Sequence, residues 1–554
     1  MKKIYLSIML SSLFIDLQSQ NFVWAKREGL WAYDYGYGIS ADNENVYVAG
    51  KYEMASNFSG IILPDHGNHD IYVAQYSSTG TLNWIRTAGG RLGDYAESLF
   101  CDGSSLYIAG EIEGYNDIIT FDGSPITLNC ISDNDIFLAK YNLKGDLLWA
   151  VSEGGLDGEK ALGITADNYG NVYICGYFQG SCDFSGVTIT ESGNKDIYIA
   201  KYDKNGIFQW VRQGGSAGRD EAKSIKCDAA GNIYITGMYS NGAVFGNITL
   251  TTSSVPTGSF YNVFLAKYAP DGSIIWIKQA GGDYDDVAWG VTIDKANKIY
   301  ITGEFNAYAL FDAIPLTTNG NADIFVACYD QLGNAQWAKS AGGILIDRAR
   351  GIGTDGTTLY ITGQFGSTVL FDTYTVTAAD SSDIFIASIN SSGNFLWATS
   401  VGGPPDALET LSYESGNAIC ADASGYVYAT GALLDGGIFG STTLNKYGRT
   451  DAFITKITQS TIGVTEQEDQ ENNYLYPNPT NGLLYLKINQ LKNAKTDKIE
   501  ILNSIGQKIY EVDGVKDQSS SNVQIDLSSL KKGIYFVEFI SEAQEIFLKK
   551  LIIQ

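Results

Sequence analysis

One unit of sequence returns seven times along this chain of 554 residues, and this repetition constrains the fold more than any other feature. Each unit has an Asp at a polar turn, then the pattern Tyr-x-x-Gly, then a phrase such as "DIFLAKY", and then a Trp. Successive Trp residues are 60 to 66 positions apart: Trp24, Trp84, Trp149, Trp210, Trp276, Trp337 and Trp397. Repeats of this length are typical of units that bury their apolar faces against neighbouring copies.

Two hairpin signals predict four strands in each unit. In "SIKCDAAGNIYITGMY" two apolar stretches flank a turn that contains Gly, and "DIFLAKYNLKGDLLWAV" has the same arrangement. The stretches "IYIT" and "IFLA" are apolar on both sides of the pleat, so both faces of each sheet must be covered. Seven sheets stacked face to face around an axis meet this requirement. We therefore predict an all-β fold with a seven-bladed β-propeller over residues 20–458.

The two ends of the repeat region predict how the ring closes. The stretch "NFVWAKR" (21–27) matches the fourth strand of a unit, and "DAFITKI" (451–457) matches a third strand that no fourth strand follows. Together the two fragments complete one sheet. We therefore predict that the N-terminal strand closes the ring through ladder hydrogen bonds.

The repeated residues are predicted to build the fold. Trp buries a large apolar area between neighbouring sheets, the turn Asp bonds to its own backbone two residues on, and Gly stands where backbones approach closely. A functional alternative is a set of sugar-stacking Trp side chains or a ring of calcium-binding Asp side chains. With their four landmarks, the units resemble SBBP-type β-propeller repeats of secreted bacterial proteins over residues 21–458.

Composition and the N-terminus exclude several classes of partner. The formal net charge of −25 argues against nucleic acid and anionic membrane surfaces, because Lys and Arg are needed to bind phosphates. The start "MKKIYLSIMLSSLFIDLQSQ" has two lysines followed by an apolar run, which predicts a signal peptide at residues 1–19. No other apolar run is long enough to span a bilayer, so we predict no transmembrane segment in the mature chain.

The C-terminal part has a different pattern. Residues 459–471 are polar and acidic and are predicted to be a linker, and the alternating strands of 472–554 predict a small immunoglobulin-like β-sandwich. This segment resembles the type A sorting domain of the type IX secretion system, on the residues Pro477, Asn478, Pro479, Gly482, Gly506 in "NSIGQK", Gly533, Tyr535, Lys549 and Lys550. The resemblance implies export by the type IX secretion machinery and removal of the domain, with the cargo released or anchored at the outer surface. The alternative is an ordinary sandwich module.

The predicted ligand-binding residues lie in the loops between the fourth strand of one unit and the first strand of the next. Aromatic residues there could stack on sugars: Trp31, Tyr33, Tyr35, Tyr95, Tyr284 and Trp289. Four acidic residues precede first strands and could ring the inner mouth: Asp94, Asp220, Asp286 and Asp347. The alternative role of these carboxylates is to bond backbone at the loop–strand junction.

The chain contains none of the familiar catalytic motifs and only two histidines, His66 and His69, so we predict no catalytic residue, no cofactor and no metal site. A structural Ca²⁺ is left open. The sequence favours a secreted or surface-anchored binding or adhesion scaffold that contacts a glycan, peptide or matrix ligand. The alternative is a glycan-active hydrolase or lyase that uses carboxylates on the same face.

Overall fold

Every element in the described part of the chain is a β-strand, and the ladders between strands are antiparallel. The computed structural model describes residues 18–42, 44–131, 133–251, 260–403, 414–434, 436–445, 447–461, 473–476, 480, 483–488, 496–502, 508–513, 522–528, 530, 532–541 and 546–553. Among these residues, no helix has the length and apolar character needed to cross a membrane. The all-β prediction is therefore confirmed.

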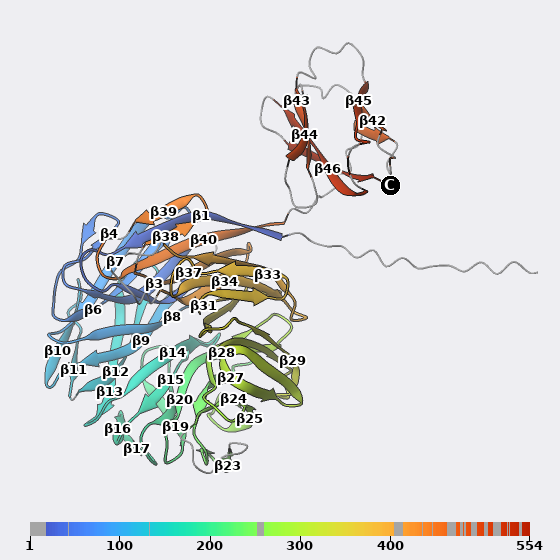
Figure 1. The fold of residues 1–554 in the computed structure, drawn as a ribbon. Coiled ribbons are helices and arrows are strands. Elements are labelled where there is room, and N and C mark those ends of the chain that lie inside the picture. The colour runs from blue at the N-terminus through green and yellow to red at the C-terminus, as the bar shows by residue number, and fades with distance from the viewer. Residues whose placement is uncertain are drawn as a thin grey trace, which may run out of the picture. The chain divides into compact units, whose positions relative to one another are not determined.

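The chain divides into two compact units, of which one is Gln20–Gln459 and the other contains Ser460–Gln554. The first unit holds four main strands for each sequence repeat (Figure 1). In the first four repeats these are β2 (Tyr35–Ala41), β3 (Asn45–Glu53), β6 (His69–Ser77) and β7 (Leu82–Gly89); β8 (Asp94–Cys101), β9 (Ser105–Glu113), β12 (Asn134–Asn142) and β13 (Leu147–Gly155); β14 (Lys160–Ala166), β15 (Val172–Phe178), β18 (Asp196–Tyr202) and β19 (Phe208–Gly215); and β20 (Glu221–Cys227), β21 (Ile233–Tyr239), β24 (Asn262–Tyr268) and β25 (Ile274–Gly281).

The last three repeats have the same organisation, and the seventh includes the N-terminal strand. Their main strands are β26 (Val287–Ile293), β27 (Ile299–Phe311), β28 (Ile314–Tyr329) and β29 (Ala335–Ala341); β30 (Arg348–Thr354), β31 (Thr358–Phe365), β34 (Asp383–Asn390) and β35 (Phe395–Val401); and β36 (Ser415–Ala421), β37 (Tyr426–Leu433), β40 (Asp451–Thr461) and β1 (Gln18–Glu28). The last sheet has the strand order β1-β40-β37-β36, so strands from both ends of the repeat region share it.

Short hairpins lie between the second and third main strands of each repeat, and in the fifth repeat the hairpin is a continuation of β27 and β28 themselves. Several of them pair with the fourth strand of the preceding repeat, so they tie neighbouring repeats together. The hairpin strands are β4 (Asn57–Phe58) and β5 (Ile61–Ile62), β10 (Asp117–Phe121) and β11 (Thr127–Cys130), β16 (Ser181–Phe184) and β17 (Val187–Thr190), β22 (Val244–Phe245) and β23 (Ile248–Thr249), β32 (Thr368–Phe371) and β33 (Tyr374–Thr377), and β38 (Gly436–Phe439) and β39 (Thr442–Asn445).

The first strands of the repeats contact one another in a cyclic order. β2 contacts β8, and the series continues through β14, β20, β26, β30 and β36, which contacts β2 again. Single parallel bridges repeat between neighbours: His69 pairs with Gly93 between the first two repeats, and Tyr33 pairs with Thr450 between the first repeat and the last. The junction between the two ends of the repeat region thus uses the same backbone contact as an ordinary junction.

The turn Asp and the Tyr of Tyr-x-x-Gly form one hydrogen-bonded unit. In the fourth repeat, one carboxylate oxygen of Asp228 accepts from the backbone N–H of Ala230 at 2.9 Å, which confirms the predicted bond two residues on. The other oxygen accepts from the Tyr234 hydroxyl at 3.0 Å. All seven repeats have this tyrosine bond, at 2.7 to 3.2 Å. The recurrence of Tyr therefore has a specific cause, which the sequence did not reveal.

The Trp side chains join neighbouring repeats. Only Trp397 is fully buried, whereas the other six are half-buried, so they lie nearer the surface than predicted. Each of these six indoles donates its N–H to a carbonyl in the turn before the fourth strand of the next repeat, as Trp149 does to Lys204 at 3.1 Å. Within the described residues the Trp397 indole N–H has no partner, because its own neighbour is the repeat whose fourth strand is β1.

A glycine at the tip of that turn packs against the same indole, and this contact can be tested. Gly206 has φ +80°, and a Cβ there would stand 2.9 Å from the ring of Trp149. Gly186 has φ +93°, but a Cβ would meet nothing within 4 Å. We expect Gly206→Ala to destabilise the protein by about 2–4 kcal/mol, against about 1–2 kcal/mol for Gly186→Ala, because only the first adds crowding to backbone strain. Denaturant titration of both variants measures the difference, and equal losses would contradict the packing argument.

The second unit contains two antiparallel sheets. They are formed by β41 (Asn473–Tyr476), β42 (Leu483–Ile488) and β45 (Asn522–Asp526), and by β43 (Thr496–Leu502), β44 (Lys508–Asp513), β46 (Gly533–Ser541) and β47 (Ile546–Ile553). Leu484 and Ile525 from one sheet share a buried core with Ile499 and Val537 from the other. Residues 1–17 of the predicted signal peptide and 462–471 of the predicted linker lie outside the described residues, and both assignments stay predictions.

Candidate functional site

A β-bulge interrupts the first strand of every repeat at the same place. In β8 the pairing with β9 shifts between Ala96 and Ser98, so Glu97 is the extra residue. The bulge is accommodated by the glycine of Tyr-x-x-Gly, because a Cβ on Gly110 would stand 1.8 Å from the carbonyl oxygen of Tyr95. A bulge re-aims a side chain. The seven extra residues differ in chemistry although their flanks are small and repetitive: Tyr37, Glu97, Leu162, Lys223, Trp289, Arg350 and Asn417.

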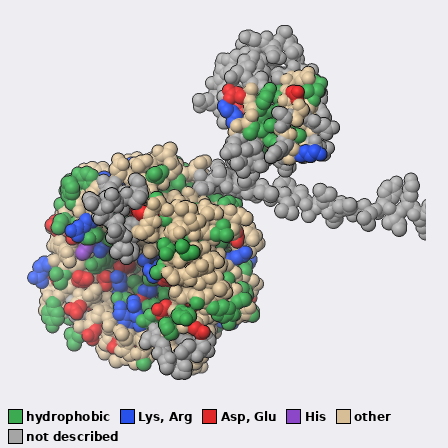
Figure 2. All heavy atoms as spheres, in the orientation of Figure 1, with side chains coloured by type: hydrophobic (Ala, Val, Ile, Leu, Met, Phe, Trp, Pro, Cys, Tyr) green, Lys and Arg blue, Asp and Glu red, His purple; other side chains and the backbone are tan. Residues whose placement is uncertain are grey.

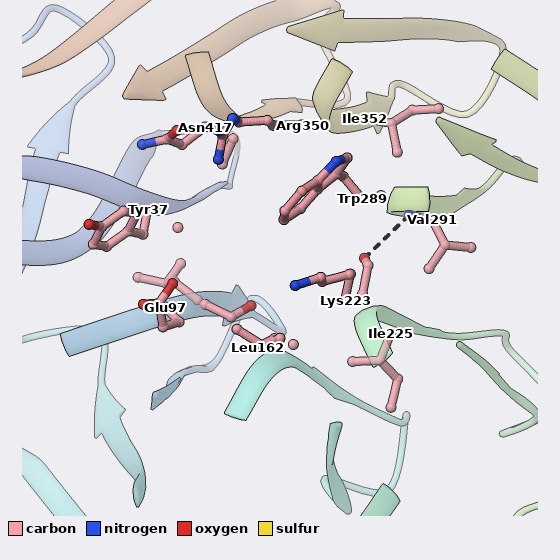
Figure 3. A pocket seen from close by; sticks show the side chains of 18 of the residues that line it. Tyr37, Glu97, Leu162, Lys223, Ile225, Trp289, Val291, Arg350, Ile352 and Asn417 are labelled. Atoms are coloured by element: carbon pink, nitrogen blue, oxygen red, sulfur yellow. Dashed lines mark hydrogen bonds between the residues drawn. The ribbon is translucent and has the colours of Figure 1, made fainter. Parts of the chain in front are cut away.

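These seven residues line a cavity of about 240 Å³ where the first strands of all repeats meet (Figure 3). An aliphatic ring follows them two residues further along each strand and also lines the cavity: Ile39, Leu99, Ile164, Ile225, Val291, Ile352 and Ile419. All seven aliphatic side chains are buried. We call this space the central cavity. Its lining combines the seven bulge residues, most of them polar or aromatic, with the seven aliphatic residues.

Ion pairs gather around the central cavity. Lys160 donates to Glu97 and to Glu111, both at 2.7 Å, and Glu221 contacts Arg219 at 2.5 Å and also pairs with Lys223. Burial opposes the charge of Lys160, but the two glutamates raise its pKa well above the usual range. Burial likewise opposes the charge of Glu221, but Lys223 and Arg219 hold its pKa below the ordinary value. Figure 2 shows acidic and basic side chains intermingled on the face that it presents.

Trp289 lies between two of the cavity's cations. The Lys223 ammonium is 4.6 Å from the centroid of its ring, and the Arg350 guanidinium carbon is 5.3 Å away. The indole N–H donates to Glu304 at 3.3 Å, and Glu304 also pairs with Arg348. The aromatic face is thus occupied by cations in this structure, and Trp289 serves the cavity wall instead of an outer loop.

The other predicted aromatic residues fall into three groups. Tyr35 and Tyr95 lie at the start of first strands, where Lys51 places its ammonium 4.9 and 4.6 Å from their rings. Tyr284 is half exposed and packs edge-on against Phe260. Trp31 and Tyr33 belong to a separate surface, described next.

Trp31, Tyr33, Tyr447 and two arginines form what we call the aromatic platform. Trp31 is 70% exposed and its ring lies 5.0 Å from that of Tyr447, which is 43% exposed. Arg27 lies over the Tyr447 ring at 4.9 Å, and Arg449 donates to the Tyr33 hydroxyl at 2.9 Å. The loops of the first and last repeats therefore present two exposed rings packed against each other, of which Tyr447 is held by Arg27.

The four predicted aspartates are fully buried at the loop–strand junction. Asp94 accepts from the backbone of Gly90 at 2.7 Å, and Asp220 accepts from Ser216 at 2.7 Å and Ser240 at 2.7 Å. Asp286 and Asp347 have the corresponding bonds. This is the geometry of the alternative role given above, and burial raises the pKa of Asp286 to about 8 and that of Asp347 to about 7. We therefore assign these carboxylates a structural role and leave them out of the candidate site.

His69 is the first residue of β6. Burial, together with the nearby Lys51, lowers its pKa to about 4, and its ring stacks on Tyr95 at 5.5 Å. Among the described residues, no three His, Cys, Asp or Glu side chains are grouped as metal ligands. The cofactor predictions stay untested.

A comparison with family models decides the nature of the C-terminal segment. Residues 474–554 match the secretion system C-terminal sorting domain. The chain therefore carries such a domain, which points to export by type IX secretion and to a secreted or outer-surface location. Of the residues that carried the resemblance, Gly533 and Tyr535 lie in β46 and Lys549 and Lys550 in β47, whereas Pro477, Asn478, Pro479, Gly482 and Gly506 lie outside the described residues.

The chain is similar over part of its length to two curated proteins. An uncharacterized WD repeat-containing protein of Acanthamoeba polyphaga mimivirus is 26% identical over 323 residues, which cover 46% of this chain and 23% of the viral protein. Regulatory protein FlaEY of Caulobacter vibrioides is 21% identical over 351 residues, which cover 55% of this chain and 34% of that protein. The chain spans about a quarter to a third of the length of these relatives. The WD-repeat likeness and the strand-rich structure fit a repeat β-propeller; the SBBP type stays a prediction.

Most of the central cavity could not be predicted from the sequence. Of the seven bulge residues, only Trp289 was among the predicted ligand-binding residues. A usable signal was present, because the position between two small residues near the start of each first strand carries seven different residue types: Tyr, Glu, Leu, Lys, Trp, Arg and Asn. Variation at a fixed structural position is what a site requires when the flanking residues are held by the fold.

Proposed function

We propose that this protein is an extracellular binding scaffold, exported by type IX secretion, whose unit Gln20–Gln459 is a seven-bladed β-propeller closed by β1. The cyclic contacts of the first strands and the shared sheet of β1 and β40 support the closed ring. The loops between repeats carry function in this proposal, because the repeated residues are used by the fold.

The aromatic platform carries the proposal. Exposed rings of this size are the usual anchors of interfaces, and Trp31 packed against Tyr447 presents an aromatic face on which a saccharide can stack. The platform favours a glycan ligand, free or attached to a matrix component. Its arginines add donors for hydroxyl or acidic groups at the edge of the rings.

Alanine substitution on the platform tests this role. We expect Trp31→Ala and Tyr447→Ala each to weaken binding of the full chain to its best hits on a glycan and matrix-protein array at least tenfold, because each removes an exposed anchor without touching the core. Tyr169→Ala is the matched control, since Tyr169 is 81% exposed in a turn at the other end of the repeat. Equal binding by all three variants would contradict the platform. Release of soluble product from an array polysaccharide would instead indicate a glycan-active enzyme.

A further inference from the structure

The central cavity concentrates cations in a protein of net charge −25. Lys223, Lys226 and Arg350 all line it, together with one carboxylate, that of Glu97, which is paired with Lys160 at 2.7 Å. Only Lys223 is matched there by a carboxylate, that of Glu221. For Lys226 and Arg350, no carboxylate of the described residues lies within ion-pair distance.

Arg350 is the better defined of the two. One terminal nitrogen of its guanidinium donates to the Gln364 side chain at 3.2 Å, and its Nε is buried without a hydrogen-bond partner. Burial lowers the pKa of Arg350, and the neighbouring Arg348 adds to this effect. A planar guanidinium with a vacant donor fits carboxylate, sulfate or phosphate oxygens in a bidentate manner.

Lys226 follows Ile225 of the aliphatic ring and lies beside an aromatic group. Its ammonium is 5.2 Å from the centroid of the Phe100 ring, and burial lowers its pKa. A buried ammonium without an opposite charge is unfavourable unless something else supplies the charge. Lys223 adds a third cation beside the Trp289 ring.

We propose that the central cavity binds the oxyanion group of a small ligand, a carboxylate, sulfate or phosphate, with Arg350 as its bidentate partner and Lys226 and Lys223 as charge partners. The volume of about 240 Å³ lies below the roughly 300–1,000 Å³ of cavities that hold whole drug-sized molecules, so a single anionic group or one acidic sugar fits. The seven buried aliphatic side chains that also line the cavity lower the local dielectric constant and so strengthen the attraction. This site is separate from the aromatic platform, so the inference does not depend on the platform's ligand.

Calorimetric titration of the full chain at low ionic strength tests the site. The probes are sodium sulfate, sodium phosphate and glucuronate, with uncharged glucose as the comparison. We expect saturable binding of at least one anion and none of glucose. Preference for glucuronate would assign the oxyanion to an acidic sugar, and comparable binding of sulfate or phosphate would assign recognition to the oxyanion itself. Binding of glucose as tight as that of glucuronate would overturn the proposal.

Two variants and one control locate the binding. Arg350→Gln and Lys226→Met are expected to weaken anion binding at least tenfold, and Lys144→Gln, which removes an exposed lysine in a turn, is expected to leave it unchanged. Thermal unfolding adds a second readout. Without anion, Lys226→Met should melt at or above the wild-type temperature, because an ammonium without an ion-pair partner is removed. Saturating sulfate should raise the melting temperature of the wild type but not that of the variant. No anion binding at millimolar concentration, or equal binding in all four proteins, would refute the site.

Discussion

A chain from which residues 20–28 are deleted is expected to lose roughly 5 kcal/mol or more of unfolding free energy, which is comparable to the whole stability of a typical domain. The deletion removes the fourth strand from the sheet β1-β40-β37-β36. It therefore leaves β40 with an open edge and separates the first and last repeats. Exposed edges of this kind pair with other chains, so we also expect aggregation.

The size of this effect follows from what β1 contacts on both sides. Towards the last repeat, the backbone carbonyl of Trp24 accepts from Thr455 at 2.9 Å and Arg27 pairs with Asp451 at 3.1 Å. Towards the first repeat, the Trp24 indole donates to the carbonyl of Ser78 at 3.0 Å, and the buried Glu28 accepts from the Tyr76 hydroxyl at 3.0 Å. Loss of the strand breaks both sets of contacts together.

A rearranged chain provides the matched control. Residues 21–28 are moved to follow Ile457 through the turn sequence "DKNG" of residues 203–206, so that Trp24 comes four residues after the turn Gly and the fourth strand joins the third by a hairpin as in the other repeats. We expect this chain to recover most of the lost stability in denaturant titration, and the new turn also offers a carbonyl to the Trp397 indole. A deletion chain as stable as wild type, or a rearranged chain no better than the deletion, would contradict closure by β1.

The parts of the fold that the sequence predicted are those that every repeat must contain. The Asp228 turn and the glycine of Tyr-x-x-Gly recur because backbone geometry demands them in each copy, so repetition alone exposes them. The central cavity could not be found in this way. Lys223 and Arg350 occupy bulges that face a common axis, and only the ring arrangement brings residues 127 positions apart into one space. Asp220 was predicted to lie at the mouth of the ring. In the structure it accepts from a backbone N–H of its own loop, and the sequence alone does not show that this N–H needs an acceptor.

Buried acidic side chains elsewhere in the repeats make the protein's stability depend on pH. Burial raises the pKa of Asp34 to about 7, that of Asp323 to about 6 and that of Glu159 to about 9. The folded chain therefore binds these protons more tightly than the unfolded chain does. Stability from such groups is fully present below their ordinary pKa values near 4 and is lost as pH rises through 6 to 9. We expect the melting temperature to fall steadily between pH 5 and pH 9, and a flat profile would contradict the buried-acid argument.

Position 323 allows this argument to be tested at one residue. Six repeats have Asp at this position of the third strand and one has Asn262, so the fold accepts either side chain there. Asp323 is buried, accepts from the Asn319 backbone at 2.9 Å through one oxygen, and has no partner for the other among the described residues. We expect Asp323→Asn to stabilise the protein by about 1–3 kcal/mol at pH 8 and to change its stability little at pH 4, where the acid is already protonated.

Asn262→Asp should act in the opposite direction at pH 8, because it adds a carboxylate beside Asp286. Urea titrations of both variants at the two pH values measure these shifts; gains or losses of equal size at pH 4 would show that packing, and not ionisation, distinguishes the two side chains.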